Sequence, residues 1–104
     1  MTSSSSLDYG QAVATVQIDN DRVRVTQWSF PPGTQTGWHL HEMDYVVVPT
    51  IAGQMSYETA DGAQATRDLV VGDSYAREAG SEHNVINKTD TEFAFVEIEL
   101  KPQG

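Results

Sequence analysis

The sequence predicts an all-β protein: a sandwich or small barrel of about eight to nine short strands. Three observations support this. No stretch of ten or more residues has the 3.6-residue apolar period of an amphipathic helix. Short runs rich in β-branched and aromatic residues recur along the chain instead. Turn signals separate these runs, among them Asn20-Asp21, Pro31-Pro32-Gly33 and Asp61-Gly62.

The chain divides into a short tail and one domain. Residues 1–11 begin with a serine-rich polar stretch and are predicted to be a flexible N-terminal tail, and residues 12–104 a single barrel domain. The predicted strands cover 12–18, 22–30, the stretch around His39 and His41, 45–48, 54–59, 63–70, 74–77, 83–87 and 93–100.

The composition excludes several classes of partner and site. The 104 residues contain six basic and fifteen acidic side chains, a formal net charge of −9. Such a surface repels phosphate backbones and anionic lipids, so we expect neither a nucleic-acid nor a membrane partner. The start of the chain lacks the basic and apolar regions of a secretory signal, and the expected location is the cytoplasm. The absence of cysteine excludes disulfides, thiolate metal sites and a cysteine nucleophile.

Two predicted strands are apolar on both faces. Residues 46–48 are consecutive valines, and the strand 93–100 has one apolar row, Ala94, Val96, Ile98 and Leu100, while Phe93 and Phe95 begin the opposite row. A barrel this small needs less apolar strand surface than that for its interior. A homodimer is therefore expected.

The chain has only three histidines. His39 and His41 are two residues apart, so on a strand their side chains share a face, about 6.5–7 Å apart along the chain. His83 lies on a distant predicted strand. Imidazoles that meet in this way can bind one metal ion, and the three histidines are the predicted metal ligands. The alternative is that one or more are ordinary surface or hydrogen-bonded histidines.

These residues resemble the two motifs of the cupins, which are small jelly-roll barrels with a double-stranded β-helix. In the first motif, Gly33, His39, His41 and Gly53 stand at the positions of the cupin glycines and histidines. In the second, Gly72, Gly80, His83 and Asn87 match every spacing, while Glu78 replaces a proline. The resemblance extends from about Ala12 to Leu100 and implies a cupin-type jelly-roll barrel. Within the cupins, the stretches 36–49 and 82–87 resemble a bacterial subgroup of single-domain proteins, the β-alanine degradation proteins of BauB type.

One departure from the cupin pattern concerns the fourth metal ligand. Cupins usually supply a glutamate at position 45 or 46, where this chain has Tyr45 and Val46. Glu42 and Asp44 have the opposite parity to the histidines and should face away from the ion. Tyr45 has the correct parity. It is predicted to be a catalytic residue that donates a hydrogen bond above the metal, with direct phenolate ligation as the alternative.

A site of three imidazoles suits a divalent transition metal: Fe, Ni, Zn, Mn or Cu. Without a carboxylate ligand, the ion keeps its full charge and three open octahedral positions. The resemblance then implies a metalloenzyme similar to non-haem iron dioxygenases, with Fe(II) favoured, acting on a small anionic chelating substrate. A metal-dependent isomerase, lyase or hydrolase is one alternative. A non-catalytic barrel that binds a small ligand is another.

Four residues are predicted to contact the substrate. Arg77 could hold a substrate carboxylate through a bidentate contact, and Tyr75 lies two residues earlier on the same face. Met55 and Tyr57 follow Gly53 and could line the cavity. For Arg77 the alternative is an exposed arginine that pairs with an acidic side chain, and for Met55 and Tyr57 it is ordinary core packing. Asn87 is expected to orient a loop or a ligand histidine.

Overall fold

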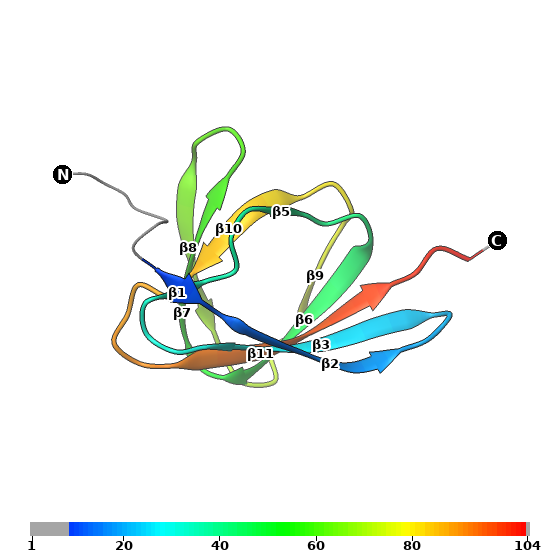
Figure 1. The fold of residues 1–104 in the computed structure, drawn as a ribbon, viewed down its shortest axis with the longest axis horizontal. Coiled ribbons are helices and arrows are strands. Elements are labelled where there is room, and N and C mark those ends of the chain that lie inside the picture. Colours follow the sequence, from blue (N-terminus) through cyan, green and yellow to red (C-terminus); the bar gives the residue numbers. More distant parts are fainter. Residues whose placement is uncertain (1–8, 104) are drawn as a thin grey trace.

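The computed structural model describes residues 9–103, which form eleven strands and no helix, in two facing sheets (Figure 1). The strands are β1 (Gly10–Gln11), β2 (Val13–Asp19), β3 (Val23–Phe30), β4 (Thr34–Gln35), β5 (His39–Leu40), β6 (Asp44–Ile51), β7 (Gly53–Thr59), β8 (Gln64–Leu69), β9 (Tyr75–Arg77), β10 (Glu82–Ile86) and β11 (Phe93–Leu100). The prediction of an all-β jelly-roll fold is confirmed. Within this part of the chain, no helix could cross a membrane.

The two sheets are built from strands that are distant in the sequence. One sheet has the order β1-β4-β10-β7-β8, with β5 also paired to β10. The other has the order β2-β3-β11-β6-β9. All pairs are antiparallel except β1 with β4. Consecutive strands such as β5 and β6, or β10 and β11, lie in different sheets, so the chain winds around a common interior.

The core lies between the sheets and is aromatic at one end. Phe30 and Phe93 are fully buried, and their rings stack with centroids 4.7 Å apart. Burying two such side chains stabilises the fold by several kcal/mol, roughly 1.5–3 kcal/mol each. A Cβ added at Gly53 would lie 2.8 Å from the Cβ of Phe93, so this strand approaches the core more closely than any other residue type allows. This explains the glycine that ends the first motif.

Most of the predicted strands agree with the structure within two residues, and β1 and β4 were not predicted. Gly10–Gln11, which we placed in the tail, pair with Thr34–Gln35 as β1. Residues 1–8 of the predicted tail lie outside the described residues. β1 and β4 are two residues each and carry no apolar alternation. Their strand conformation comes from tertiary pairing, which a local pattern does not encode.

Candidate metal centre

Two neighbouring strands bring the three histidines together. β5 pairs antiparallel with β10, and the register places His39 directly opposite His83. His41 follows the end of β5, but its backbone continues the same pairing: its N–H donates to Ser81 O and its carbonyl accepts from Gly80 N, both at 2.8 Å. The positive φ of Gly80, 104°, allows the turn that makes this contact. The parity predicted from sequence therefore holds.

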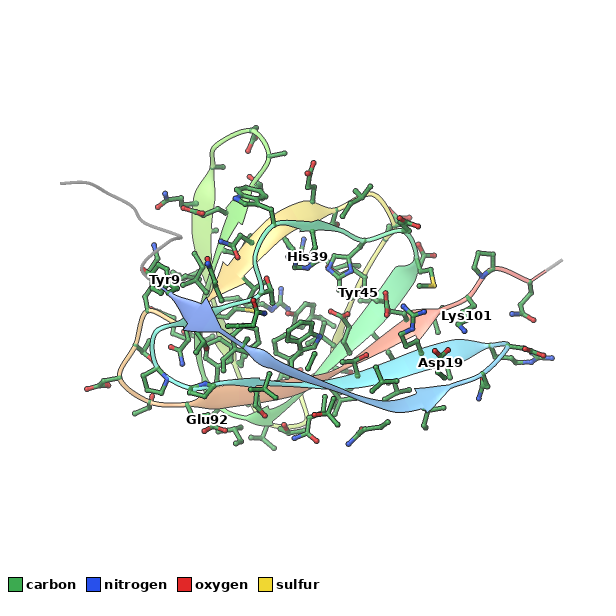
Figure 2. All side chains as sticks on the ribbon, viewed as in Figure 1. Tyr9, Asp19, His39, Tyr45, Glu92 and Lys101 are labelled. Carbon is green, nitrogen blue, oxygen red and sulfur yellow. The ribbon has the colours of Figure 1, made fainter. Side chains whose placement is uncertain are left out.

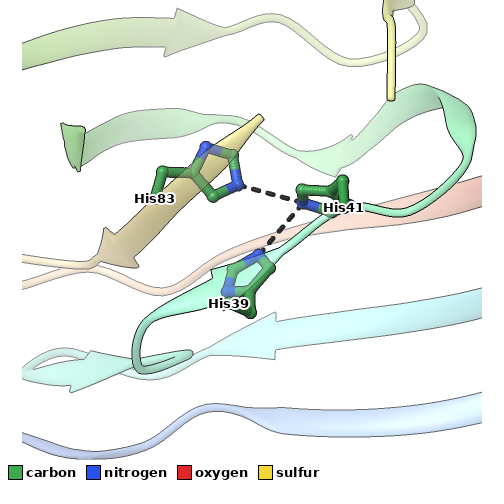
Figure 3. A group of neighbouring side chains, drawn as sticks. All are labelled: His39, His41 and His83. Carbon is green, nitrogen blue, oxygen red and sulfur yellow. Dashed lines mark hydrogen bonds between the residues drawn. The ribbon is translucent and has the colours of Figure 1, made fainter. Parts of the chain in front are cut away.

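The three imidazoles converge on one point (Figure 3). Nε2 of His41 lies 3.0 Å from Nε2 of His39 and 3.0 Å from Nε2 of His83. The rings stand edge to face, with interplanar angles of 70° to 88°. Three ring nitrogens thus point at one small volume from three directions.

This geometry fits a transition-metal ion. Two nitrogen ligands bound at roughly 2.0–2.1 Å lie roughly 2.9–3.4 Å apart at octahedral to tetrahedral angles. The observed spacing of 3.0 Å falls in this range. A second group with metal-ligand atoms, His41 with Glu97 and Glu99, shares one of the histidines. In that group Glu99 also faces Arg24 at 3.8 Å, so the three-histidine set is the better metal site.

Polar neighbours hold His39 in the form that a metal needs. Its Nδ1 donates to the carbonyl of Gly37 at 2.9 Å, which leaves the lone pair of Nε2 free. The hydroxyl of Thr36 lies 3.3 Å from the same Nδ1. Oδ1 of Asn84, a fully buried residue, accepts from the N–H of Gly37 at 3.0 Å. These contacts couple the turn before β5 to the strand that carries His83.

The environment keeps two of the histidines unprotonated. Burial, followed by the neighbouring His39 and His83, lowers the pKa of His41 to about 3. Burial also lowers the pKa of His83 to about 4, with smaller effects from His39 and Arg77. At neutral pH both imidazoles offer a lone pair, as a metal ligand must.

Tyr45 lies against the metal centre, as its parity predicts. It is 3% exposed, and its ring stacks on His41 with centroids 3.9 Å apart and planes at 19°. Figure 2 shows it near His39 in the space between the sheets. Burial, reinforced by Glu97, raises the pKa of Tyr45 to about 12, so its hydroxyl is a proton donor. Glu42 and Asp44 are exposed, in agreement with the parity that points them away from the histidines.

A cavity and a wider hollow adjoin the histidines. The inner cavity is about 20 Å³, room for a water molecule, and the hollow that opens from the barrel is about 330 Å³. Both spaces are lined by Trp28, Thr36, His39 and Glu97. His83 lines the inner cavity and His41 the hollow. A small molecule in the hollow would reach the metal centre directly.

The predicted substrate-contacting residues divide into two pairs. Tyr75 and Met55 line the inner cavity. Arg77 is exposed at the edge of the barrel with its guanidinium 6.0 Å from the ring centroid of Tyr57. Neither Arg77 nor Tyr57 is among the residues that line the cavity or the hollow. Asn87 orients a loop: its side chain donates to Phe30 O and accepts from Thr89 N.

The sequence interpretation missed Glu97. This residue lies mid-strand on β11 and faces the interior in the same row as Phe93 and Phe95. Burial, and secondarily the charge of Glu99, raises its pKa to about 7. A signal was present in the sequence, because the alternation that points Phe93 and Phe95 inward also points Glu97 inward.

The double-stranded β-helix and its three converging histidines define a small barrel with a candidate metal site. Residues 26–99 match the family model described as "Cupin domain". The chain belongs to the cupin family.

Individual relatives agree with this assignment. The chain is 53% identical, over 91 residues, to the β-alanine degradation protein BauB of Pseudomonas aeruginosa, covering 88% of this chain and 95% of the relative. A crystal structure of a cupin domain from Bordetella pertussis is 58% identical, with a TM-score of 0.86 over 90% of this chain and 97% of that one. An RmlC-like cupin from Methanocaldococcus jannaschii shares the fold at 15% identity, with a TM-score of 0.74 over 90% and 84% of the two chains.

Proposed function

We propose that this cupin binds one divalent transition metal ion through His39, His41 and His83 and is a metal-dependent enzyme acting on a small chelating molecule. The observation that carries the proposal is that Nε2 of His41 lies 3.0 Å from Nε2 of both His39 and His83, beside a hollow of about 330 Å³. Hollows of this size hold small ligands. The name of the Pseudomonas aeruginosa relative supports a role in the breakdown of small amino acids.

The reaction class that we favour is dioxygenation, in which the oxygen atoms of O2 are added to the substrate. A bound Fe(II) ion would supply redox chemistry and open positions for a chelating substrate. The protein would contribute an apolar, aromatic surrounding, from Trp28 and Tyr75, that limits access of water. Tyr45 would fix the ring of His41 and donate its phenolic proton to the bound molecule.

The metal site is tested by elemental analysis of purified protein. Wild type should carry close to one equivalent of metal, and His83→Ala should lose most of it because one of three ligands is gone. Glu82→Ala is the matched control, since it removes the exposed side chain next to His83 on the same strand. Equal metal in wild type and His83→Ala would contradict the three-histidine site.

The reaction class needs a separate assay. Iron-loaded wild type should consume oxygen with at least one thiol-carboxylate or β-dicarbonyl compound, and His83→Ala should not. If iron-containing wild type consumes no oxygen with any of these compounds, the proposal of a dioxygenase is wrong.

We also propose that the protein is a homodimer formed through the outer face of the sheet β2-β3-β11-β6-β9. Tyr45 and Val47 point into the core, so Val46 and Val48 point outward, and the register places Ile98 beside Val46. Val96 lies beside Val48 in the same way. These side chains are only partly buried within one chain. An apolar sheet face of this kind is typical of an interface.

Light scattering at micromolar concentration should give the mass of two chains. Ile98→Glu should give a monomer, because it places a charge in the proposed interface. Val71→Glu is the control: Val71 is 60% exposed in a turn, outside the proposed interface. A monomeric wild type would contradict the dimer.

A further inference from the structure

Glu97 lies where the inner cavity and the hollow meet. On β11 its backbone pairs with Thr26 of β3 and Val47 of β6, so it occupies the middle of the sheet and faces the other sheet. Its side chain lines both spaces, together with His39. A carboxylate oxygen of Glu97 comes within 4.8 Å of a ring nitrogen of His41. A molecule bound at the histidines would therefore lie beside this carboxylate.

Glu97 has no partner of opposite charge among residues 9–103. The nearby arginines are occupied by other groups. Arg24 contacts Asp19 at 3.5 Å and Glu99 at 3.8 Å. The guanidinium of Arg67 lies 3.5 Å above the ring of Tyr75, and that of Arg77 lies 6.0 Å from the ring centroid of Tyr57. A partly buried carboxylate without a cation is costly, because nothing in the protein replaces the water that it loses.

The walls around Glu97 are aromatic. Trp28, Tyr45, Tyr75 and Phe95 line the same cavity as Glu97, and Trp28 extends into the hollow. Aromatic faces attract cations through their quadrupole, and Trp is the strongest of them. Aromatic rings with one carboxylate favour a protonated amine over an anion. The charged residues that line the hollow are Arg24, Glu97 and Glu99, which give it a formal charge of −1.

We propose that Glu97 and Trp28 form a subsite for the ammonium group of the substrate, whose opposite, anionic end chelates the metal at the three histidines. The substrate class is then a small zwitterion with the two ends joined by a short chain. The part of this inference that places the anionic end on the metal rests on the proposed function. It also revises the prediction of a purely anionic substrate, because the charged side chain that reaches the cavity is Glu97, and Arg77 does not line it.

The test uses three ligands that differ only at the far end: β-alanine with an ammonium group, propionate without one, and succinate with a carboxylate. Each is titrated by calorimetry into zinc-loaded protein, since zinc carries out no redox reaction. Wild type should bind β-alanine about tenfold more tightly than propionate, the range expected of a charge-assisted hydrogen bond. Succinate should bind most weakly, because Glu97 repels its second carboxylate.

Glu97→Gln keeps the shape of the side chain and removes its charge. In this variant the preference for β-alanine over propionate should fall to within about twofold, and succinate should bind more tightly than to wild type, with the zinc content unchanged. Glu92→Gln is the matched control, as Glu92 is exposed just before the same strand, and it should retain the wild-type preference (Figure 2). The proposal is wrong if wild type shows no preference for β-alanine, including no binding of either ligand, or if both variants behave alike.

A second measurement separates this inference from the metal site. Propylammonium has no chelating end, so its binding to metal-free protein, followed by NMR, depends on the ammonium subsite alone. Wild type and Glu92→Gln should bind it, and Glu97→Gln should bind it at least fivefold more weakly. Equal binding by all three would overturn the ammonium subsite even if the metal site is correct. Selective loss in Glu97→Gln would support the subsite even if the protein holds no metal.

Discussion

Replacing Glu97 with glutamine should stabilise the metal-free protein, and only at neutral or alkaline pH. The folded protein raises the pKa of Glu97 from 4.5 to about 7, chiefly through burial. Between these values the folded chain holds a proton that the unfolded chain has released. The free energy of unfolding therefore falls as pH rises from 4.5 to about 7. Above pH 7 it stays at this lower value as far as Glu97 is concerned. The amide of glutamine does not titrate and escapes this loss.

The size of the effect follows from the pKa difference. One pH unit corresponds to about 1.36 kcal/mol, so the ionised carboxyl costs at most about 3 kcal/mol at pH 8 and less than about 1 kcal/mol at pH 5. Glu97→Gln should therefore gain up to about 3 kcal/mol over wild type at pH 8 and much less at pH 5. For a chain of this length, such a gain raises the melting temperature by roughly 10 °C or more.

Urea denaturation at both pH values is the assay. The midpoint of Glu97→Gln should exceed that of wild type at pH 8 with an unchanged slope, which indicates a change in stability rather than in the exposed surface. Glu92→Gln should match wild type at both pH values, because Glu92 is exposed. An equal gain at pH 5 and pH 8 would refute the reasoning, since a packing effect does not depend on protonation.

Three further predictions concern the metal centre and the core. Tyr45→Phe should keep the metal, because the ring still stacks on His41, but should lower turnover by about 10²-fold or more if the hydroxyl donates a proton, as steady-state kinetics would show. Gly53→Ala should lower the free energy of unfolding by roughly 1–3 kcal/mol in urea, because the new Cβ lies 2.8 Å from a core Cβ. The third prediction uses metal-free Glu97→Gln, because titration of Glu97 would change stability in the opposite direction. In this variant the free energy of unfolding should fall by roughly 2–4 kcal/mol from pH 8 to pH 5. The unfolded chain gains protons at the ordinary histidine pKa of 6.5, whereas folded His41 and His83, with pKa values of about 3 and about 4, do not.

Each of these predictions has a control. Tyr45→Leu removes the stacked ring and should lose metal as well as activity; equal turnover in Tyr45→Phe and wild type would exclude the hydroxyl from the reaction. Gly10→Ala places its Cβ 3.7 Å from the nearest atom and should leave stability nearly unchanged. If the free energy of unfolding of Glu97→Gln stays constant or rises from pH 8 to pH 5, the lowered pKa values of His41 and His83 are wrong.

The predictions that succeeded depend on local periodicity. Alternation with a period of two fixed which side of a strand faces inward, so the sequence placed His39, His41 and Tyr45 on one face and Glu42 and Asp44 on the other. The same alternation could have revealed Glu97. It was missed because a glutamate in a strand is usually exposed.

The predictions that failed or stayed open depend on distant parts of the chain. β1 and β4 are strands only because they pair with each other and, for β4, with β10. Whether Arg77 reaches the cavity depends on where the edge strand β9 ends relative to the sheet it joins. The register pairs Arg77 with the inward-facing Tyr45, but the Arg77 side chain is exposed, near Tyr57 and outside the residues that line the cavity.

By itself the sequence determined the all-β class, the approximate strands and the three histidines as candidate metal ligands, because strand periodicity and motif spacing are local properties of the chain. Only the tertiary structure decided that Nε2 of His41 lies 3.0 Å from Nε2 of both His39 and His83, since this depends on the register of β5 against β10. It also decided that a carboxylate beside the candidate metal centre comes from Glu97 on the opposite sheet. Proximity between residues 41 and 97 is a product of the fold, and no short stretch of sequence contains it.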